Sequence, residues 1–96
     1  MDMEIIKDKF QVIEIVEKEN SLQDTSFNVF FENGYGASVV RGPYTYGGDR
    51  GLYEVAIIKG IPEEWELCYE TSITNDVVGN LSKHEVMDML INIQKL

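Results

Sequence analysis

Over residues 26–32, near the middle of the chain, Phe27, Val29 and Phe31 alternate with Ser26, Asn28, Phe30 and Glu32. The side chains at every second position from Phe27 are all apolar and fall on one side, which is typical of a strand with one buried face. Asn33-Gly34 follows at once, and this dipeptide is the best match to a type I′ turn. Residues 37–41 then run back as a second arm, so the pattern predicts a β-hairpin.

Two more strands are predicted after the hairpin. Residues 52–58 carry apolar groups on both alternating faces, as a central strand does. Residues 59–64 turn the chain, and residues 65–70 form a last strand. The aromatic and leucine side chains of that strand fall on one side and Cys68 on the other.

The last part of the chain predicts a helix. Ser82 and Glu85 have the S-x-x-E spacing of a capping box, in which the serine oxygen and the glutamate each accept a backbone N–H. A stripe of apolar residues at spacings of 3 and 4 follows: Val86, Met89, Leu90, Ile93 and Leu96. We expect this stripe to pack on the sheet.

Residues 4–18 fit two interpretations. Ile6, Phe10, Ile13 and Val16 recur at helical spacings, but the segment from Phe10 onward is also rich in residues that favour strands. We favour a helix, and the strand remains the alternative. The polar residues 19–25 then predict a loop.

Together these elements predict one α+β domain over residues 1–96. Its antiparallel sheet has about four strands, packed on one face by the C-terminal helix and, on the helical interpretation of residues 4–18, by an N-terminal helix as well. With 96 residues, 44% of them apolar and 26% charged, the chain has enough apolar surface for a single core.

Charge and cysteine content narrow the classes of function. Acidic residues outnumber basic ones 17 to 8, and the net charge of −9 repels phosphate backbones and anionic membranes. One cysteine allows no intramolecular disulfide, the acidic N-terminus does not look like a signal peptide, and no apolar run reaches the length of a membrane span. We therefore expect a cytoplasmic protein that binds neither nucleic acid directly nor membranes.

Candidate catalytic and metal-binding groups are sparse. His84 is the only histidine and falls inside the capping box, where we expect it to face solvent. A Cys68–His84 couple would need the two side chains within hydrogen-bonding reach. One cysteine and one histidine do not make a structural zinc site, and Asp49 lacks the repeated carboxylates of a calcium loop. The sequence predicts no enzymatic activity, no metal and no cofactor.

The first candidate partner surface is the glycine-rich loop of residues 42–51. Tyr44, Tyr46 and Arg50 are of the types enriched in binding hot spots, and Asp49 lies among them. Tyr35, from the neighbouring hairpin, would complete an aromatic patch around one cation. In the structural alternative, the tyrosines fold back on the sheet and Arg50 pairs with a carboxylate.

The second candidate surface is acidic. Between Gly60 and Ser82 there are five acidic residues and no lysine or arginine. Glu63, Glu64 and Glu66 are its electrostatic candidates for partner binding. Such a strip could imitate a phosphate backbone in the basic groove of a nucleic-acid enzyme, although a solvated sheet face is the commoner outcome.

Three blocks of sequence carry a resemblance: NGYGASVVR at residues 33–41, YGGDRGLYEVAII at residues 46–58 and ELCYETSITNDVVGNL at residues 66–81. In this order they resemble a group of small, acidic, uncharacterised proteins encoded by phages and prophages, mainly of Gram-positive bacteria. The likeness covers about residues 27–96. Members of that group would have a proline near Ser72, and its absence here leaves the course of the turn at residues 70–76 open.

The resemblance implies a phage origin and transfers no activity to particular residues. It supports the expectation of a non-enzymatic phage or prophage accessory protein that binds and modulates a host or phage protein, for instance as an inhibitor of a defence system. Three alternatives remain: an acidic nucleic-acid mimic, a small-molecule-binding protein, and a homo-oligomeric structural protein, since exposed strand edges invite pairing.

Overall fold

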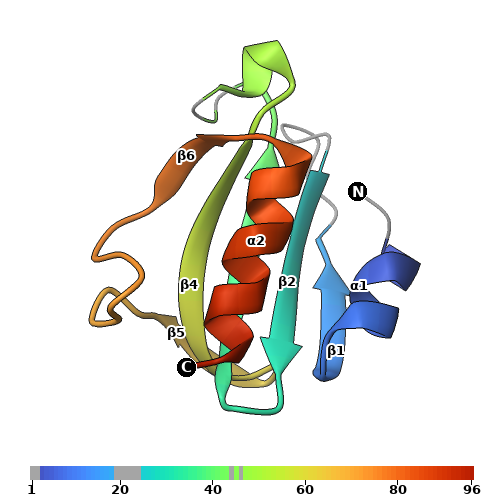
Figure 1. The fold of residues 1–96 in the computed structure, drawn as a ribbon, viewed down its shortest axis with the longest axis vertical. Helices are drawn as coiled ribbons and strands as arrows, with labels where there is room; N and C mark the ends of the chain where they lie inside the picture. The colour runs from blue at the N-terminus through green and yellow to red at the C-terminus, as the bar shows by residue number, and fades with distance from the viewer. Residues whose placement is uncertain (1–2, 19–24, 44, 46) are drawn as a thin grey trace.

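The computed structural model describes residues 3–18, 25–43, 45 and 47–96. Its elements, in chain order, are α1 (Met3–Lys9), β1 (Val12–Glu17), β2 (Thr25–Phe31), β3 (Tyr35–Arg41), the 3-10 helix η1 (Gly48–Arg50), β4 (Tyr53–Ile61), β5 (Glu64–Leu67), β6 (Val78–Leu81) and α2 (Lys83–Gln94). The strands form one antiparallel sheet in the order β1-β2-β3-β4-β5, and β6 pairs with another part of β4 (Figure 1). The predicted α+β class is confirmed.

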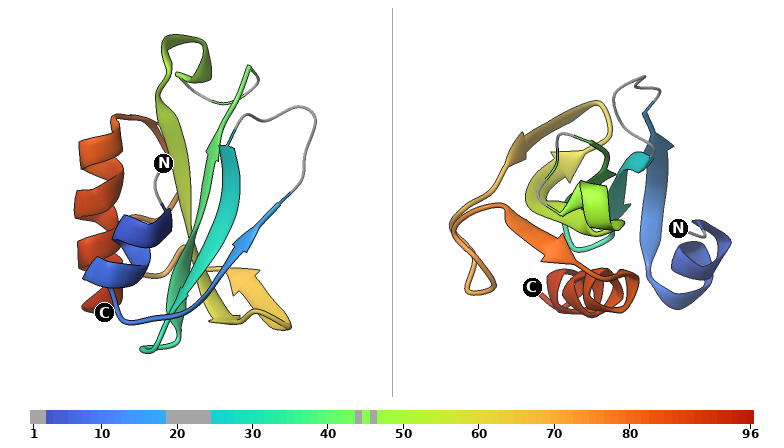
Figure 2. Two further views of the ribbon diagram at one scale, coloured as in Figure 1. Left: turned by 90° about the vertical axis from the view of Figure 1, so that its right-hand side faces the viewer. Right: turned by 90° about the horizontal axis from the view of Figure 1, so that it is seen from above.

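The two helices lie on the same side of the sheet, whereas β5 turns away toward the opposite side (Figure 2). We call the side without helices the back face. On the helix side, α2 packs against β3, β4 and β6. The core between them consists of side chains with almost no exposed surface: Ile6, Phe27, Val29, Phe31, Val39, Val55, Ile57, Val86, Leu90 and Ile93.

The expected number of strands is wrong, because the described part of the sheet has six strands rather than four. One extra strand, β1, lies inside the segment for which we favoured a helix. The other, β6, contains Gly79 and Asn80, and Asn80 has a positive φ of 59°. The four residues of β6 do not alternate between apolar and polar side chains, so their sequence does not indicate a strand.

Residues 4–18 contain both of the structures that their sequence suggests. The helical interpretation is right for Met3–Lys9 and wrong for Val12–Glu17, which pairs with β2. The helix ends where the Phe10 N–H donates to the Ile6 carbonyl, and Phe10 packs on Phe31 with ring centroids 5.8 Å apart. Of the predicted loop, residues 19–24 lie outside the described residues, and Thr25 already belongs to β2.

The hairpin of β2 and β3 is confirmed, but its turn differs from the prediction. A type I′ turn needs positive φ at both central residues. Here Gly34 has a φ of +89°, while Asn80 is the one non-glycine among the described residues with a positive φ, so Asn33 does not qualify. The Gly34 N–H bonds to the Phe31 carbonyl at 3.2 Å, which closes the turn one residue earlier than predicted.

The predicted helix α2 is confirmed together with its cap. Ser82 Oγ accepts from the Glu85 N–H at 3.1 Å, and Glu85 Oε1 accepts from the Ser82 N–H at 3.0 Å. Val86, Met89, Leu90 and Ile93 are buried as expected. Leu96 lies beyond the end of the helix and is exposed, so it does not continue the apolar stripe.

Candidate functional site

The loop of residues 42–51 stands at one end of the sheet and carries η1 at its tip (Figure 1). It is held by its own hydrogen bonds. Thr45 Oγ1 both accepts from the Gly42 N–H and donates to the Gly42 carbonyl, at 2.9 Å each. Gly47 and Gly51, on either side of η1, have φ of 79° and 75°, a conformation that favours glycine. The tip is therefore a turn with a defined backbone conformation.

Arg50 is held against the sheet by this turn. Its Nη2 donates to Asn80 Oδ1 of β6 at 2.6 Å, so its partner is an amide and not the carboxylate considered from the sequence. Asp49 and Arg50 are both exposed. Tyr44 and Tyr46 lie outside the described residues.

Tyr35 does not join this loop. It begins β3, whereas the loop follows the last residue of β3, Arg41. A seven-residue strand spans about 20 Å, so Tyr35 lies far from Asp49 and Arg50, the loop candidates that the structure describes. The ring of Tyr35 instead lies under Lys59, whose Nζ is 5.5 Å from the ring centroid.

Tyr35 shares its end of the sheet with the acidic candidates. Glu63 lies in the turn between β4 and β5, and Glu64 and Glu66 lie on β5 itself. The register places Tyr35 opposite Lys59 and Lys59 opposite Glu66. The structure thus divides the sequence candidates into two groups: Asp49 and Arg50 at one end, and Tyr35 with the three glutamates at the other.

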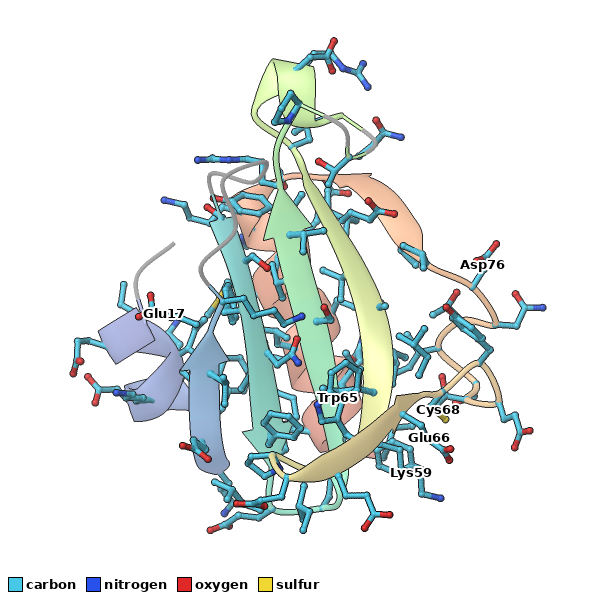
Figure 3. The ribbon with its side chains drawn as sticks, turned by 180° about the vertical axis from the view of Figure 1, so that it is seen from behind. Glu17, Lys59, Trp65, Glu66, Cys68 and Asp76 are labelled. Carbon is cyan, nitrogen blue, oxygen red and sulfur yellow. The ribbon has the colours of Figure 1, made fainter. Side chains whose placement is uncertain are left out.

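All four residues of β5 are exposed, including two large apolar ones. Trp65 is 39% exposed and Leu67 is 50% exposed, and Ile61 and Tyr69 are exposed beside them. Figure 3 shows β5 crossing the back face of the sheet, with Trp65 lying over it. We define the β5 surface as Glu63, Glu64, Trp65, Glu66 and Leu67. The sequence placed Trp65 and Leu67 on one side of a strand, but alternation does not tell whether that side is covered.

Polar groups lie on the back face of the sheet, and one of them contacts Trp65. Lys18 Nζ lies 5.7 Å from the centroid of the Trp65 ring and 3.4 Å from Ser38 Oγ. Burial lowers the pKa of Lys18, because the charged ammonium is partly removed from water. Asn28, opposite Ser38 in the register, is only 3% exposed, and its Oδ1 has no hydrogen-bond partner in the described structure.

Two hollows run along β5. One of about 430 Å³ is lined by Lys59, Gly60, Glu64, Trp65 and Glu66. The other, of about 310 Å³, continues from Lys59 and Glu66 to Leu67, Cys68, Tyr69 and Glu70. Both are open at the surface, and Glu66 of β5 lies together with Lys59 and Cys68 (Figure 3). The β5 surface is therefore an exposed strand with two adjoining depressions along it.

Cys68 and His84 are not brought together. Cys68 directly follows β5 and is half-buried against the core, with its N–H bonded to the Ile57 carbonyl at 2.8 Å. His84 lies in the first turn of α2, at the opposite end of that helix from β5 (Figure 1). It is exposed, and its Nε2 lies 3.5 Å from Asp88 Oδ2.

Two searches of the described residues gave negative results. No cluster of three or more His, Cys, Asp or Glu side chains has an arrangement that could hold a metal ion. No helix in that part of the chain has the length and apolar character needed to cross a membrane.

Comparison of the chain with protein-family models, with curated proteins and with solved structures finds no significant match.

Proposed function

We propose that this chain is a non-enzymatic binding protein and that it holds a partner protein on the β5 surface. The observation that carries the proposal is the exposure of Trp65 and Leu67 on a strand at the end of the sheet order. Tryptophan is among the residue types that most often dominate binding energy. A large apolar side chain left at the surface beside other apolar side chains is typical of an interaction site.

The rest of the domain does not need these side chains for its main core. The core between the sheet and the helices is built from other residues, and neither Trp65 nor Leu67 belongs to it or packs against it. We therefore expect the core between the sheet and the helices to survive their removal. The back face has buried apolar residues of its own, Phe30, Ala56 and Ile58, so urea unfolding of the variant is measured alongside its binding.

The phage resemblance of residues 27–96 suggests where to search for the partner. The first experiment is a tagged pulldown from a Gram-positive lysogen, read by mass spectrometry, followed by calorimetry with the purified candidate. We expect Trp65→Ala with Leu67→Ala to raise the Kd by about 30-fold or more, because loss of one hot-spot side chain removes about 2 kcal/mol of binding free energy.

The matched control is Ile13→Ala with Val16→Ala, which removes two exposed apolar side chains from β1, the other outer strand of the sheet. This pair should bind as the parent does. Equal binding by the β5 variant and the parent would exclude the β5 surface as the partner site.

The loop of residues 42–51 is the competing surface, and the same experiment distinguishes it. Tyr46→Ala with Arg50→Ala removes one of its aromatic rings and its guanidinium group. If the β5 surface binds the partner, this variant captures it unchanged. If the loop binds the partner, capture is lost while thermal stability stays nearly the same.

A nucleic-acid mimic is the second candidate function, and one observation favours it. All five acidic residues between Gly60 and Ser82 are exposed: Glu63, Glu64, Glu66, Glu70 and Asp76. A mimic would bind a basic groove through charge alone. Its affinity would fall steeply with salt and would survive the loss of Trp65 and Leu67.

A further inference from the structure

The pairing of β5 with β4 determines which of its backbone groups are free. The Cys68 N–H donates to the Ile57 carbonyl, and the register continues from there through Lys59 opposite Glu66 to Ile61 opposite Glu64. In an antiparallel pair, hydrogen-bonded and non-hydrogen-bonded positions alternate. Glu64 and Glu66 therefore bond to β4, and the N–H and C=O groups of Trp65 and Leu67 point outward.

No strand of the described sheet takes up these outward groups, because β5 is the last strand on its side of the order. The free edge thus presents two N–H donors and two C=O acceptors, next to two exposed apolar side chains. An extended segment from another molecule can satisfy all four groups by pairing as one more strand, which is a common way of recognising peptides.

We propose that the partner contacts this protein through an extended, lysine- or arginine-rich strand that pairs antiparallel with the free edge of β5. The inference rests on the proposed function of the β5 surface and names the class of segment that it binds. Side chains of an added strand lie beside those of the residues they face. Apolar residues of the segment would therefore lie beside Trp65 and Leu67, and its basic residues beside Glu64 and Glu66.

Charge favours this occupant over a second copy of the chain. Two β5 strands paired with each other would place the glutamates of one beside those of the other, between two molecules that each carry a net charge of −9. Like charges placed opposite each other destabilise a strand pair. A basic segment meets the same glutamates with favourable charge.

Two lysines lie near this edge, and both already contact aromatic rings. Lys59 lies over Tyr35, and Lys18 lies over Trp65. The exposed acids of the β4–β5 turn and of β5, namely Glu63, Glu64 and Glu66, outnumber them, and Glu70 follows two residues after Cys68.

The test uses a capped peptide of eight residues that alternates lysine and valine, with the full chain as the receptor. Trp65 is the only tryptophan, so its fluorescence reports occupancy of β5 without a label. On binding, we expect the amide protons of Trp65 and Leu67 to become protected from hydrogen exchange. The amide protons of Glu64 and Glu66, which already bond to β4, should not change.

N-methylation separates strand addition from simple charge attraction. In the antiparallel arrangement, the valines face Trp65 and Leu67 and direct their N–H groups to β5, whereas the lysines direct theirs away. Methylating the two central valine nitrogens removes two hydrogen bonds and should weaken binding roughly 30-fold. Methylating the backbone nitrogens of the two central lysines should leave the affinity unchanged. Equal affinity of the two methylated peptides would overturn strand addition.

The role of the glutamates is tested on the protein. Glu64→Gln with Glu66→Gln should raise the Kd of the lysine–valine peptide about fivefold, as expected for the loss of two exposed ion pairs. The control, Glu14→Gln with Glu17→Gln, changes two exposed glutamates of β1 and should have no effect. A peptide with glutamate in place of lysine should not bind, and tight binding of it would overturn the basic partner class.

The two proposals fail in different ways. In one outcome, the lysine–valine peptide does not bind β5, but the Trp65→Ala, Leu67→Ala variant no longer binds the natural partner. Strand addition is then wrong and the proposed function stands. If the natural partner is unaffected by that double substitution, the proposed function itself is wrong, whatever the peptide does.

Discussion

Asn33 joins two parts of the molecule that are far apart in sequence. Its Nδ2 donates to the carbonyls of Ile93 and Gln94 at 2.9 Å each, and its Oδ1 accepts from the Tyr35 N–H at 3.0 Å. The last carbonyls of a helix lack partners within the helix. One amide side chain in the first hairpin therefore completes the C-terminal end of α2.

Replacing Asn33 should destabilise the whole domain. We expect Asn33→Ala to lower the free energy of unfolding by about 1–2 kcal/mol, as for two or three lost hydrogen bonds. Asn33→Asp should be at least as destabilising, because it puts a negative charge at the negative end of the helix dipole. Urea unfolding measures both. Asn92→Ala, an exposed amide on α2, is the control and should cost less than about 0.5 kcal/mol.

The capping box makes stability depend on pH. The N–H of Ser82 lowers the pKa of Glu85, and the Ser82 hydroxyl and nearby His84 lower it further. A carboxylate whose pKa is lower in the folded state stabilises the fold above its unfolded pKa, which is about 4.3 for a glutamate. That contribution is lost as the pH falls through the folded-state pKa.

We therefore expect the stability difference between the parent and Glu85→Ala to be constant near neutral pH and to shrink as the pH falls below about 4. Glu85→Gln keeps an acceptor for the Ser82 N–H but does not titrate, so its difference from Glu85→Ala should not depend on pH. Chemical unfolding at a series of pH values measures both differences. A parallel decline in both would contradict the role given to the carboxylate.

The capping box was predictable because its residues interact within one turn of chain. The role of Asn33 was not, because its partners are 60 and 61 residues away. The Asn-Gly dipeptide indicated a turn correctly, but not its type or the distant helix end that Asn33 contacts.

At the level of elements, α1 is short but supplies a core residue. Ile6 has no exposed surface, while its neighbour Ile5 is 46% exposed. A seven-residue helix is not stable alone, so α1 depends on packing and the sheet in turn depends on its apolar side chain.

The pair of isoleucines gives a matched test. Ile6→Ala should lower the free energy of unfolding by about 2–4 kcal/mol, because it leaves a cavity in the core. Ile5→Ala should lower it by less than about 0.5 kcal/mol. Equal effects, measured by urea unfolding, would show that α1 is not packed as described.

Sequence patterns predicted the elements with a clear period and a marked boundary. The hairpin and α2 are of that kind. The segment around Phe10 changes from helix to strand without a glycine or proline at the junction, and its β-branched residues become a strand because β2 offers them a partner. That choice depends on tertiary pairing, which local pattern does not contain.

For the whole molecule, we expect the net charge to oppose self-association through the free edge of β5. At pH 7 the chain carries nine net negative charges, and its pI is about 4.4. We expect a monomer at neutral pH and reversible association near the pI, where repulsion between copies is lost. Sedimentation velocity at the two pH values measures this, with circular dichroism to confirm that the fold persists. A stable dimer at pH 7 would contradict it.

The candidate site was only partly predictable, because it depends on contacts between strands that are distant in the sequence. The glutamates of β5 were found from local charge, and Tyr35 was named for its residue type. That Tyr35 lies with these glutamates and not with Arg50 follows from the register of three strands. The exposure of Trp65 follows from the path of β5 across the back face, which no local pattern specifies.

The position of α2 after every strand has a consequence for biosynthesis. While the strands leave the ribosome, the apolar face formed by Phe27, Val39, Val55 and Ile57 has no cover, and Asn33 has no helix end to bind. We therefore expect the nascent sheet to leave this apolar face uncovered until residues 82–94 emerge and fold as α2.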